Sequence, residues 1–586
     1  MLAIVAGAVQ AGELSLQLDG VDDPLKAAAL AASEIAQYDK KQVTAAQAKR
    51  LYDNASEQIG EALEAYGYFN AKTDGELKET AQGWTAVIHV RPGEAMRVAQ
   101  WNVDVPSPAR EEKAVALALA NFYPKSGGVL DSGAYEKSKA ALQSALQAQG
   151  YLDAHAAVHK IEVVRSANRA NLTLQWDVGR RYRFGPVVFE GGQFADGFLD
   201  RYIPWRDGDF YTQGDLLHLQ QKLIDADYFA LVDLQPDREH ATDAVIPVHV
   251  LLAPAKRNIY TAGIFVDSDI GFGVKGGVTR RWINVHGHRL KVEAQIAQHA
   301  NSLGANYMIP LPGPYDRSLN FDTVYNDMNT STVLSKTLRL NAHEQRQWHG
   351  FTRTIGINAL GGTFTVANID GRSTEIYPEL TLERKQQDDR TFVRNGYALT
   401  LDARASPGLL SDTKFVQVRA DAKWIRGIGE HQRVILRGSL GATAVDDFDE
   451  LPPELRFFAG GDRSIRGFAF QTVGQPLAEE LVPIAQENCR THPKTSCKEL
   501  IIGGQNLAIV GAEHEYYFRP NWGVATFVDA GDAFGAANTF YTHIGTGVGL
   551  RWRSPVGMVR VDLGFPVRDR ENRHGVQLHL MIGPDL

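Results

Sequence analysis

From about residue 257 onward, apolar and polar residues alternate one by one along nearly the whole chain. Leu290, Val292, Ala294 and Ile296 alternate with charged or amide residues, and the stretch 416–424 repeats the pattern. Because side chains of a β-strand point alternately to two faces, this predicts strands with one apolar and one polar face. The polar face also carries many glycines, which helps to explain why 55 of the 586 residues are glycine.

Alternation alone fits two architectures, a soluble β-sandwich and a membrane barrel with its apolar face toward lipid. Residues 257–586 are long for one sandwich, and at roughly 20 residues per strand and turn they give about 16 strands of a length that spans a bilayer at a tilt. No apolar run reaches the ~18 residues that a spanning helix needs. We therefore expect a 16-stranded antiparallel transmembrane β-barrel over residues 257–586.

The preceding residues alternate between helical and strand periods and repeat. Three helical stripes end at Tyr68, Tyr151 and Tyr228, which are 83 and 77 residues apart. We expect three α+β modules, at residues 12–94, 95–181 and 182–256, each in the order strand, helix, helix, strand, strand. Exposed sheet edges in such modules could capture an extended segment by strand addition, or the modules could be plain spacers.

Two further features concern export and oxidation. Residues 1–11 are largely apolar and end in Val-Gln-Ala, which fits a truncated signal peptide or, alternatively, a short first strand. Cys489 and Cys497 are the two cysteines of the chain, and their spacing suits a disulfide that closes a surface loop, with two free thiols as the alternative.

One glycine-rich segment, residues 460–468, contains Arg466 between apolar neighbours. A buried arginine needs a carboxylate partner, and Glu513 and Asp529 stand on the polar faces of later predicted strands. The alternative is an arginine in a solvated loop.

This segment resembles the [VI]RG[FY] signature on the sixth extracellular loop of the BamA/TamA superfamily, outer-membrane insertases built from periplasmic POTRA modules and a sixteen-strand barrel. Residues 527–531, Phe-Val-Asp-Ala-Gly, resemble the family's F-x-D-x-G strand motif. The resemblance implies that the loop docks inside the barrel and that its arginine pairs with the strand acid. The residues that it assigns are Gly461, Ile465, Arg466, Gly467 and Phe468 in the loop, Asp529 and Glu513 as partners, and Phe527 and Gly531 in the strand motif.

Three modules and an ending in Gly-Pro-acid-Leu are most similar to the TamA branch of that superfamily. The resemblance implies insertion or translocation of barrel proteins such as autotransporters, and possible help with phospholipid passage to the outer membrane. It also implies unfolded outer-membrane proteins as substrates, a location in the bacterial outer membrane with the modules in the periplasm, and a TamB-like inner-membrane-anchored partner at the first module.

The barrel must close between its first and last strands, at about 258–266 and 577–582. Proline donates no ladder hydrogen bond, so an ending in Gly-Pro predicts a short, weak seam. Such a seam could open laterally and offer free edges to an incoming strand. The seam residues are Tyr260, Gly263, Leu578, Leu580, Gly583 and Pro584.

Other functions fit less well. A two-partner secretion pore remains the alternative, but residues 12–24 offer no plug helix, and a passive porin has no use for three modules. We expect no enzyme activity, no cofactor and no metal, although Asp446, Asp447, Asp449 and Glu450 could hold Ca²⁺. A net charge of −8 argues against nucleic-acid binding.

Overall fold

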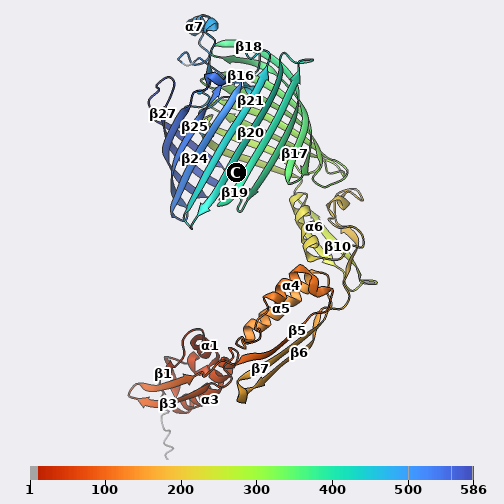
Figure 1. Ribbon diagram of the computed structural model, residues 1–586, viewed down its shortest axis with the longest axis vertical. Helices are drawn as coiled ribbons and strands as arrows, with labels where there is room; N and C mark the ends of the chain where they lie inside the picture. The colour runs from red at the N-terminus through yellow and green to blue at the C-terminus, as the bar shows by residue number, and fades with distance from the viewer. Residues whose placement is uncertain (1–10, 499, 556, 584) are drawn as a thin grey trace, which may run out of the picture. The chain divides into compact units, whose positions relative to one another are not determined.

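The computed structural model describes residues 11–498, 500–555, 557–583, 585 and 586 (Figure 1). The expected signal peptide, residues 1–11, lies outside the described residues except for Ala11, where the first strand begins. The chain divides into two compact units. The first contains most of residues up to 251, and the second contains residues 252–586 together with the segments 191–202 and 223–231. None of the described helices combines the length and apolarity needed to cross a membrane.

The first α+β module departs from the expected order, because a short helix, α2, and a short strand, β2, lie between its two main helices. Its sheet has the order β2-β1-β4-β3, in which β1 and β4 run parallel. Its long helix begins where Thr44 Oγ1 accepts the N–H of Gln47, and it buries Leu51, Ile59 and Leu63 on one stripe. Its elements are β1 (Ala11–Asp19), α1 (Leu25–Ala32), α2 (Glu34–Gln37), β2 (Lys41–Thr44), α3 (Ala45–Glu64), β3 (Lys72–Thr80) and β4 (Gly83–Arg91).

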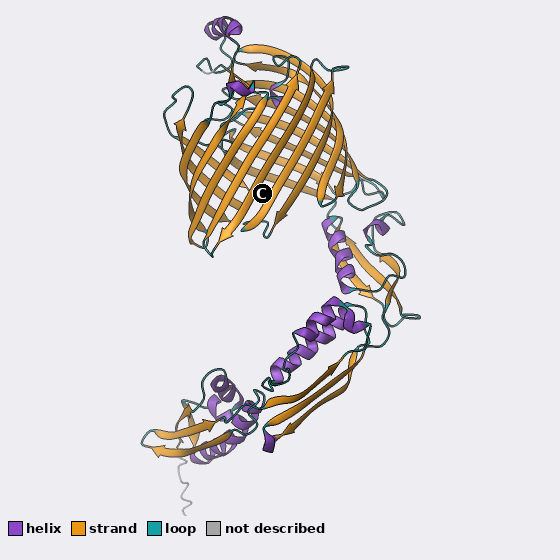
Figure 2. Cartoon of the chain, viewed as in Figure 1, coloured by secondary structure: helices purple, strands orange, loops and turns teal. Residues whose placement is uncertain are grey.

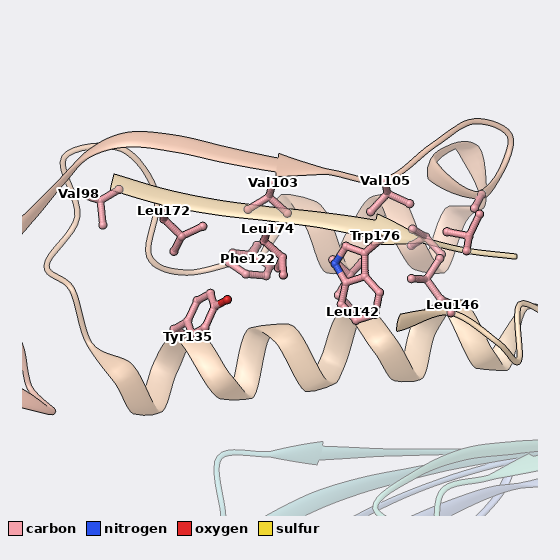
Figure 3. Packing of buried hydrophobic residues seen from close by; sticks show 14 of the residues in the cluster. Val98, Val103, Val105, Phe122, Tyr135, Leu142, Leu146, Leu172, Leu174 and Trp176 are labelled. Carbon is pink, nitrogen blue, oxygen red and sulfur yellow. The ribbon is translucent and has the colours of Figure 1, made fainter. Parts of the chain in front are cut away.

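The second module packs two helices on a sheet in the order β5-β7-β6. Figure 3 shows Leu172, Leu174 and Trp176 of β7 facing Tyr135 and Leu142 of α5, so one face of the sheet is buried by the helix. Its elements are β5 (Arg97–Asp104), η1 (Ala109–Glu111), α4 (Lys113–Ala120), α5 (Ser132–Ala148), β6 (His155–Val164), η2 (Arg165–Ala167) and β7 (Arg169–Asp177).

The third module also departs from the expected order, because one α-helix, not two, is found in its described residues. The first helix is replaced by a short 3₁₀ turn, in a segment interrupted by Gly191, Gly192, Gly197 and Pro204. The sheet order is β8-β10-β9. The elements are β8 (Arg183–Glu190), η3 (Leu199–Tyr202), α6 (Gln213–Asp225), β9 (Phe229–Pro236) and β10 (Val245–Pro254).

The rest of the chain forms a nearly closed 16-stranded antiparallel barrel, which confirms the predicted fold class and excludes a sandwich (Figure 2). Consecutive strands are neighbours except that β21 pairs with β24. The strands are β11 (Asn258–Asp267), β12 (Gly271–Arg280), β13 (Arg289–Ala297), β14 (Ala300–Pro310), β15 (Ser318–Asn329), β16 (Val333–Trp348), β17 (Phe351–Val366), β18 (Ile369–Gln387), β19 (Asn395–Pro407), β20 (Lys414–Ile428), β21 (Gln432–Val445), β24 (Asn506–Arg519), β25 (Trp522–Phe534), β26 (His543–Ser554), β27 (Gly557–Arg568) and β28 (Gln577–Gly583).

Burial in the barrel is inverted relative to a soluble protein. Large apolar side chains such as Leu440 and Val510 are exposed on the outer face, by 61% and 62%. Charged side chains such as Arg433, Glu515 and Arg551 are fully buried on the inner face. This is the pattern of a wall with lipid outside and packed polar groups inside.

A long loop, residues 446–505, connects β21 to β24. It follows the eleventh strand of the barrel, so it lies at the end opposite to the start of β11. Cys489 and Cys497 form a disulfide in it, with Cα atoms 5.9 Å apart. Its elements are η4 (Pro453–Leu455), β22 (Gln475–Pro476), η5 (Glu479–Leu481), α7 (Val482–Thr491) and β23 (Ile501–Gly503), and η6 (Ala537–Thr539) lies between β25 and β26.

Candidate functional site

The glycine-rich segment of the long loop lies folded against the inner wall of the barrel. Ile465 and Phe468 are buried in a cluster with Leu507 and Ile509 of β24 and Ala533 of β25. Apolar side chains on both sides of Arg466 therefore anchor the loop, and its guanidinium is carried into the interior.

Arg466 is 4% exposed and meets three carboxylates from three strands. Its Nε lies 2.8 Å from Asp529 Oδ2 on β25, and its Nη1 lies 2.6 Å from Glu513 Oε2 on β24 and 3.0 Å from Asp562 Oδ2 on β27. The main-chain N–H of Arg466 also donates to Asp529 Oδ2, at 3.2 Å. The guanidinium stacks 3.6 Å from the ring centroid of Phe527, a cation–π contact.

These contacts belong to a larger charge network. It connects five arginines to five carboxylates without a break, so these ten groups together are neutral. Neutrality matters because an unpaired charge at this depth would be costly. The arginines are Arg433, Arg437, Arg466, Arg551 and Arg560, and the carboxylates are Glu513, Glu515, Asp529, Asp562 and Asp585.

Glycines on the wall let the loop backbone approach directly. A Cβ at Gly545 of β26 would overlap the carbonyl oxygen of Arg466, and a Cβ at Gly564 of β27 would lie 2.5 Å from the nitrogen of Gly467. Gly467 itself has φ +99° and lies against the backbone of Phe565, a conformation that other residues rarely adopt. In the strand motif, a Cβ at Gly531 would overlap the backbone of β24. Gly545 and Gly564 of the wall thus leave the space that the loop backbone occupies.

The seam between β11 and β28 lacks a ladder. Every strand of the barrel is hydrogen-bonded to the next one in the sheet, but the first strand, β11, and the last strand, β28, are not hydrogen-bonded to each other as a ladder. Among the described residues one backbone bond crosses the seam, from the N–H of Ser268 to the carbonyl of Leu580, at 3.3 Å. By contrast, β28 makes seven register pairs with β27, from Met558–Gly583 to Gly564–Gln577.

That bond is the one point from which an overlap of the two strands can be extrapolated. If an antiparallel register continued from Ser268 and Leu580, Gly583, the end of β28, would lie opposite residue 265. On that register Tyr260 and Gly263 would lie beyond the end of β28, and Leu578 and Leu580 would lie at the other end of the overlap. Pro584 lies outside the described residues.

Beyond β28 the chain turns inward. The carboxylate of Asp585 is fully buried, and its Oδ2 accepts from Arg433 Nη1 at 2.7 Å and from the N–H of Val393 at 2.9 Å. Its Oδ1 pairs with Arg560. The end of the last strand is thus held by the charge network.

Sequence reasoning named Arg466, Asp529 and Glu513 in this site but missed the remaining members of the network. Their signal was present, because Arg551, Arg560 and Asp562 alternate with apolar residues and so belong to the inner face. The acidic stretch that could have held Ca²⁺ is instead exposed, and the Asp446 and Asp447 carboxylates accept main-chain N–H groups.

Comparison with known proteins gives two family matches. The model described as the Omp85 superfamily domain matches residues 286–585, and the model described as a POTRA domain, TamA domain 1, matches residues 15–92.

The outer membrane protein assembly factor BamA of Nitratidesulfovibrio vulgaris is 24% identical over 420 residues, which cover 66% of this chain and 49% of that protein. The chain thus spans about half the length of the curated relative that it matches. The solved structure of BamA from Haemophilus ducreyi lacking POTRA domains 1–3 superposes with a TM-score of 0.66 at 16% identity, covering 83% of this chain and 98% of that one, which shows a shared fold. CdiB from Acinetobacter baumannii gives 0.46 at 14% identity, covering 83% and 90%.

Proposed function

Because the chain belongs to the Omp85 superfamily, we propose that it is a TamA-type assembly factor that inserts or translocates barrel proteins, such as autotransporters, at the seam between β11 and β28. The barrel lies in the outer membrane, and the POTRA domain lies in the periplasm. Support for the TamA type comes from the first module, whose residues 15–92 match the TamA-type POTRA model.

The observation that carries the proposal is the unpaired seam. A net contribution of ~0.5–1.5 kcal/mol for a hydrogen bond makes the single Ser268–Leu580 bond a weak closure. The outer edge of β11 from 258 to 264 has no partner strand in the described part of the chain. Such an edge can pair with an extended substrate strand through main-chain hydrogen bonds, without any covalent or cofactor chemistry.

The docked loop supplies the rigid wall that an opening seam needs. Arg466 joins β24, β25 and β27 through Glu513, Asp529 and Asp562, and the N–H of Gly467 donates to His579 Nε2 on β28 at 3.1 Å. The loop therefore braces the last strands as one body. Opening would then be confined to the boundary between β28 and β11.

Strand addition also suggests how a partner protein would bind the first module. A TamB-like inner-membrane-anchored protein would bind the first module, and unfolded outer-membrane proteins would be the substrates. The module offers β3 as a nine-residue sheet edge, exposed along most of its length, to which a partner strand could be added.

Photocrosslinking tests this function. A photoreactive phenylalanine analogue at Tyr260, which is 73% exposed on the free part of β11, should crosslink to substrate barrels during their assembly. The matched control is Tyr325, which is 42% exposed on β15, a strand paired on both sides. Crosslinks at Tyr260 and not at Tyr325 support strand addition at the seam, and equal yields at both positions contradict it.

A further inference from the structure

Three carboxylates converge where the docked loop passes the end of the first barrel strand. Asp267 is the last residue of β11, Asp269 lies in the turn that follows, and Asp462 belongs to the loop. One carboxylate oxygen from each lies within 4.8 Å of the other two.

Asp462 is the unusual member of this group. It is 5% exposed, and neither of its carboxylate oxygens has a hydrogen-bond donor among the described residues. Arg437 is close, but its guanidinium donates to the carbonyls of Asp462 and Ser464 and pairs with Asp529. A buried carboxylate without donors is strongly disfavoured unless a cation or a proton accompanies it.

The backbone is shaped to bring the carboxylates together. The main-chain N–H of Asp462 points at the Asp269 carboxylate, with oxygens at 3.3 and 3.4 Å. A Cβ at Gly461 would lie 2.7 Å from Asp269 Oδ2, so only glycine allows this approach.

We propose that Asp267, Asp269 and Asp462 bind one calcium ion. Carboxylate oxygens are the ligands that this hard cation prefers, at about 2.3–2.6 Å. The three oxygens lie within 4.8 Å of one another, close enough to contact one ion of this size. Magnesium usually keeps several waters and takes one or two protein carboxylates, so a group of three carboxylates favours calcium. Asp267 and Asp269 are partly exposed, so water completes the coordination.

The ion would connect the two sides of the seam. Asp267 and Asp269 belong to the β11 side, whereas the loop that carries Asp462 is fixed to β27 by the Arg466–Asp562 pair and to β28 by the Gly467–His579 hydrogen bond. Calcium would therefore replace part of the missing ladder with a bridge through the loop. Binding itself does not depend on the proposed function.

Isothermal titration calorimetry on the full chain in detergent, after treatment with a chelator, tests the proposal. Titration with CaCl₂ should show one saturable site per chain, bound more tightly than Mg²⁺. Asp462→Asn should weaken the affinity at least tenfold, a loss of the size that follows removal of groups that support a metal site. Asp267→Asn provides a second variant if Asp462→Asn does not fold, as judged by heat-modifiable gel mobility.

Asp447→Asn is the matched control, because Asp447 is an exposed acid of the same long loop. Its affinity should equal that of the unmodified chain. Three results would overturn the proposal: no saturable binding at millimolar Ca²⁺, unchanged binding in folded Asp462→Asn or Asp267→Asn, and loss of binding in Asp447→Asn. Equal affinity for Mg²⁺ would overturn the choice of calcium.

Discussion

Replacement of Arg466 by alanine should release the docked loop while the barrel stays folded. Among the described residues of the loop, only the Arg466 guanidinium reaches carboxylates on β24, β25 and β27 at once. Its removal leaves the other nine groups of the network with one excess negative charge. The strands keep their ladders, because none of their backbone hydrogen bonds involves this side chain.

The free-energy cost of undocking depends on which arginine each carboxylate keeps as a partner. Breaking a buried ion pair costs about 3–5 kcal/mol when one partner is removed. Here Asp529 keeps Arg437 at 2.7 Å, and Glu513 keeps Arg551 at 2.6 Å. The low end of the range, ~3 kcal/mol, is therefore the better value. At ~1.4 kcal/mol for each factor of ten, the undocked population of the loop should rise on the order of 100-fold.

Limited proteolysis in detergent measures this population, because cleavage follows the open fraction when opening is fast. Cleavage between residues 446 and 505 should accelerate by a factor of that order in Arg466→Ala. Arg463→Ala is the matched control, since Arg463 is an exposed arginine three residues away. A cleavage rate equal to that of the unmodified chain, in a barrel with normal heat-modifiable mobility, would refute a docking role for Arg466.

Further changes probe the same site. Gly545→Ala should undock the loop to a similar extent, because its Cβ would overlap the Arg466 carbonyl, whereas Gly304→Ala, with no atom nearer than 3.9 Å, should not, as the same proteolysis would show. Cys489→Ser with Cys497→Ser should cost about 2–3 kcal/mol locally and speed cleavage in α7, leaving the 460–468 segment protected; mass spectrometry of the fragments would locate the cuts. Asp585→Asn should free the end of β28 from Arg433 and Arg560 and lower the temperature at which the barrel loses its compact gel mobility, while Asp447→Asn should leave it unchanged.

The sequence predicted the features that follow from local pattern. Alternation in residues 257–586 predicted strands with one apolar and one polar face. The length of this region, at roughly 20 residues per strand and turn, predicted about 16 strands. The three helical stripes that end at Tyr68, Tyr151 and Tyr228 likewise predicted α3, α5 and α6. The third module was mispredicted because its glycines and proline interrupt a helix that the repeat implied.

Contacts between distant strands could not be predicted in the same way. Arg466 lies 96 residues from Asp562, and Arg433 lies 152 from Asp585, so their meeting depends on the register of every strand between them. The inward turn of Asp585 has no periodic signal at all. The orphaned carboxylate of Asp462 likewise becomes visible only once the loop is placed beside β11.

A reversible lock on the seam tests the central claim, that the chain works by opening between β11 and β28. With Cys489 and Cys497 first replaced by serine, Val266→Cys and Ile582→Cys occupy the two positions that face each other when the antiparallel register is continued from the Ser268–Leu580 bond, and oxidation should join them whenever the seam is closed. Val274→Cys with Ile296→Cys, a registered pair on β12 and β13, provides the control lock. Assembly of an unfolded outer-membrane barrel into vesicles that contain the chain should stop in the oxidised seam variant, resume on reduction, and continue in the oxidised control. Full activity of a quantitatively locked seam would contradict lateral opening.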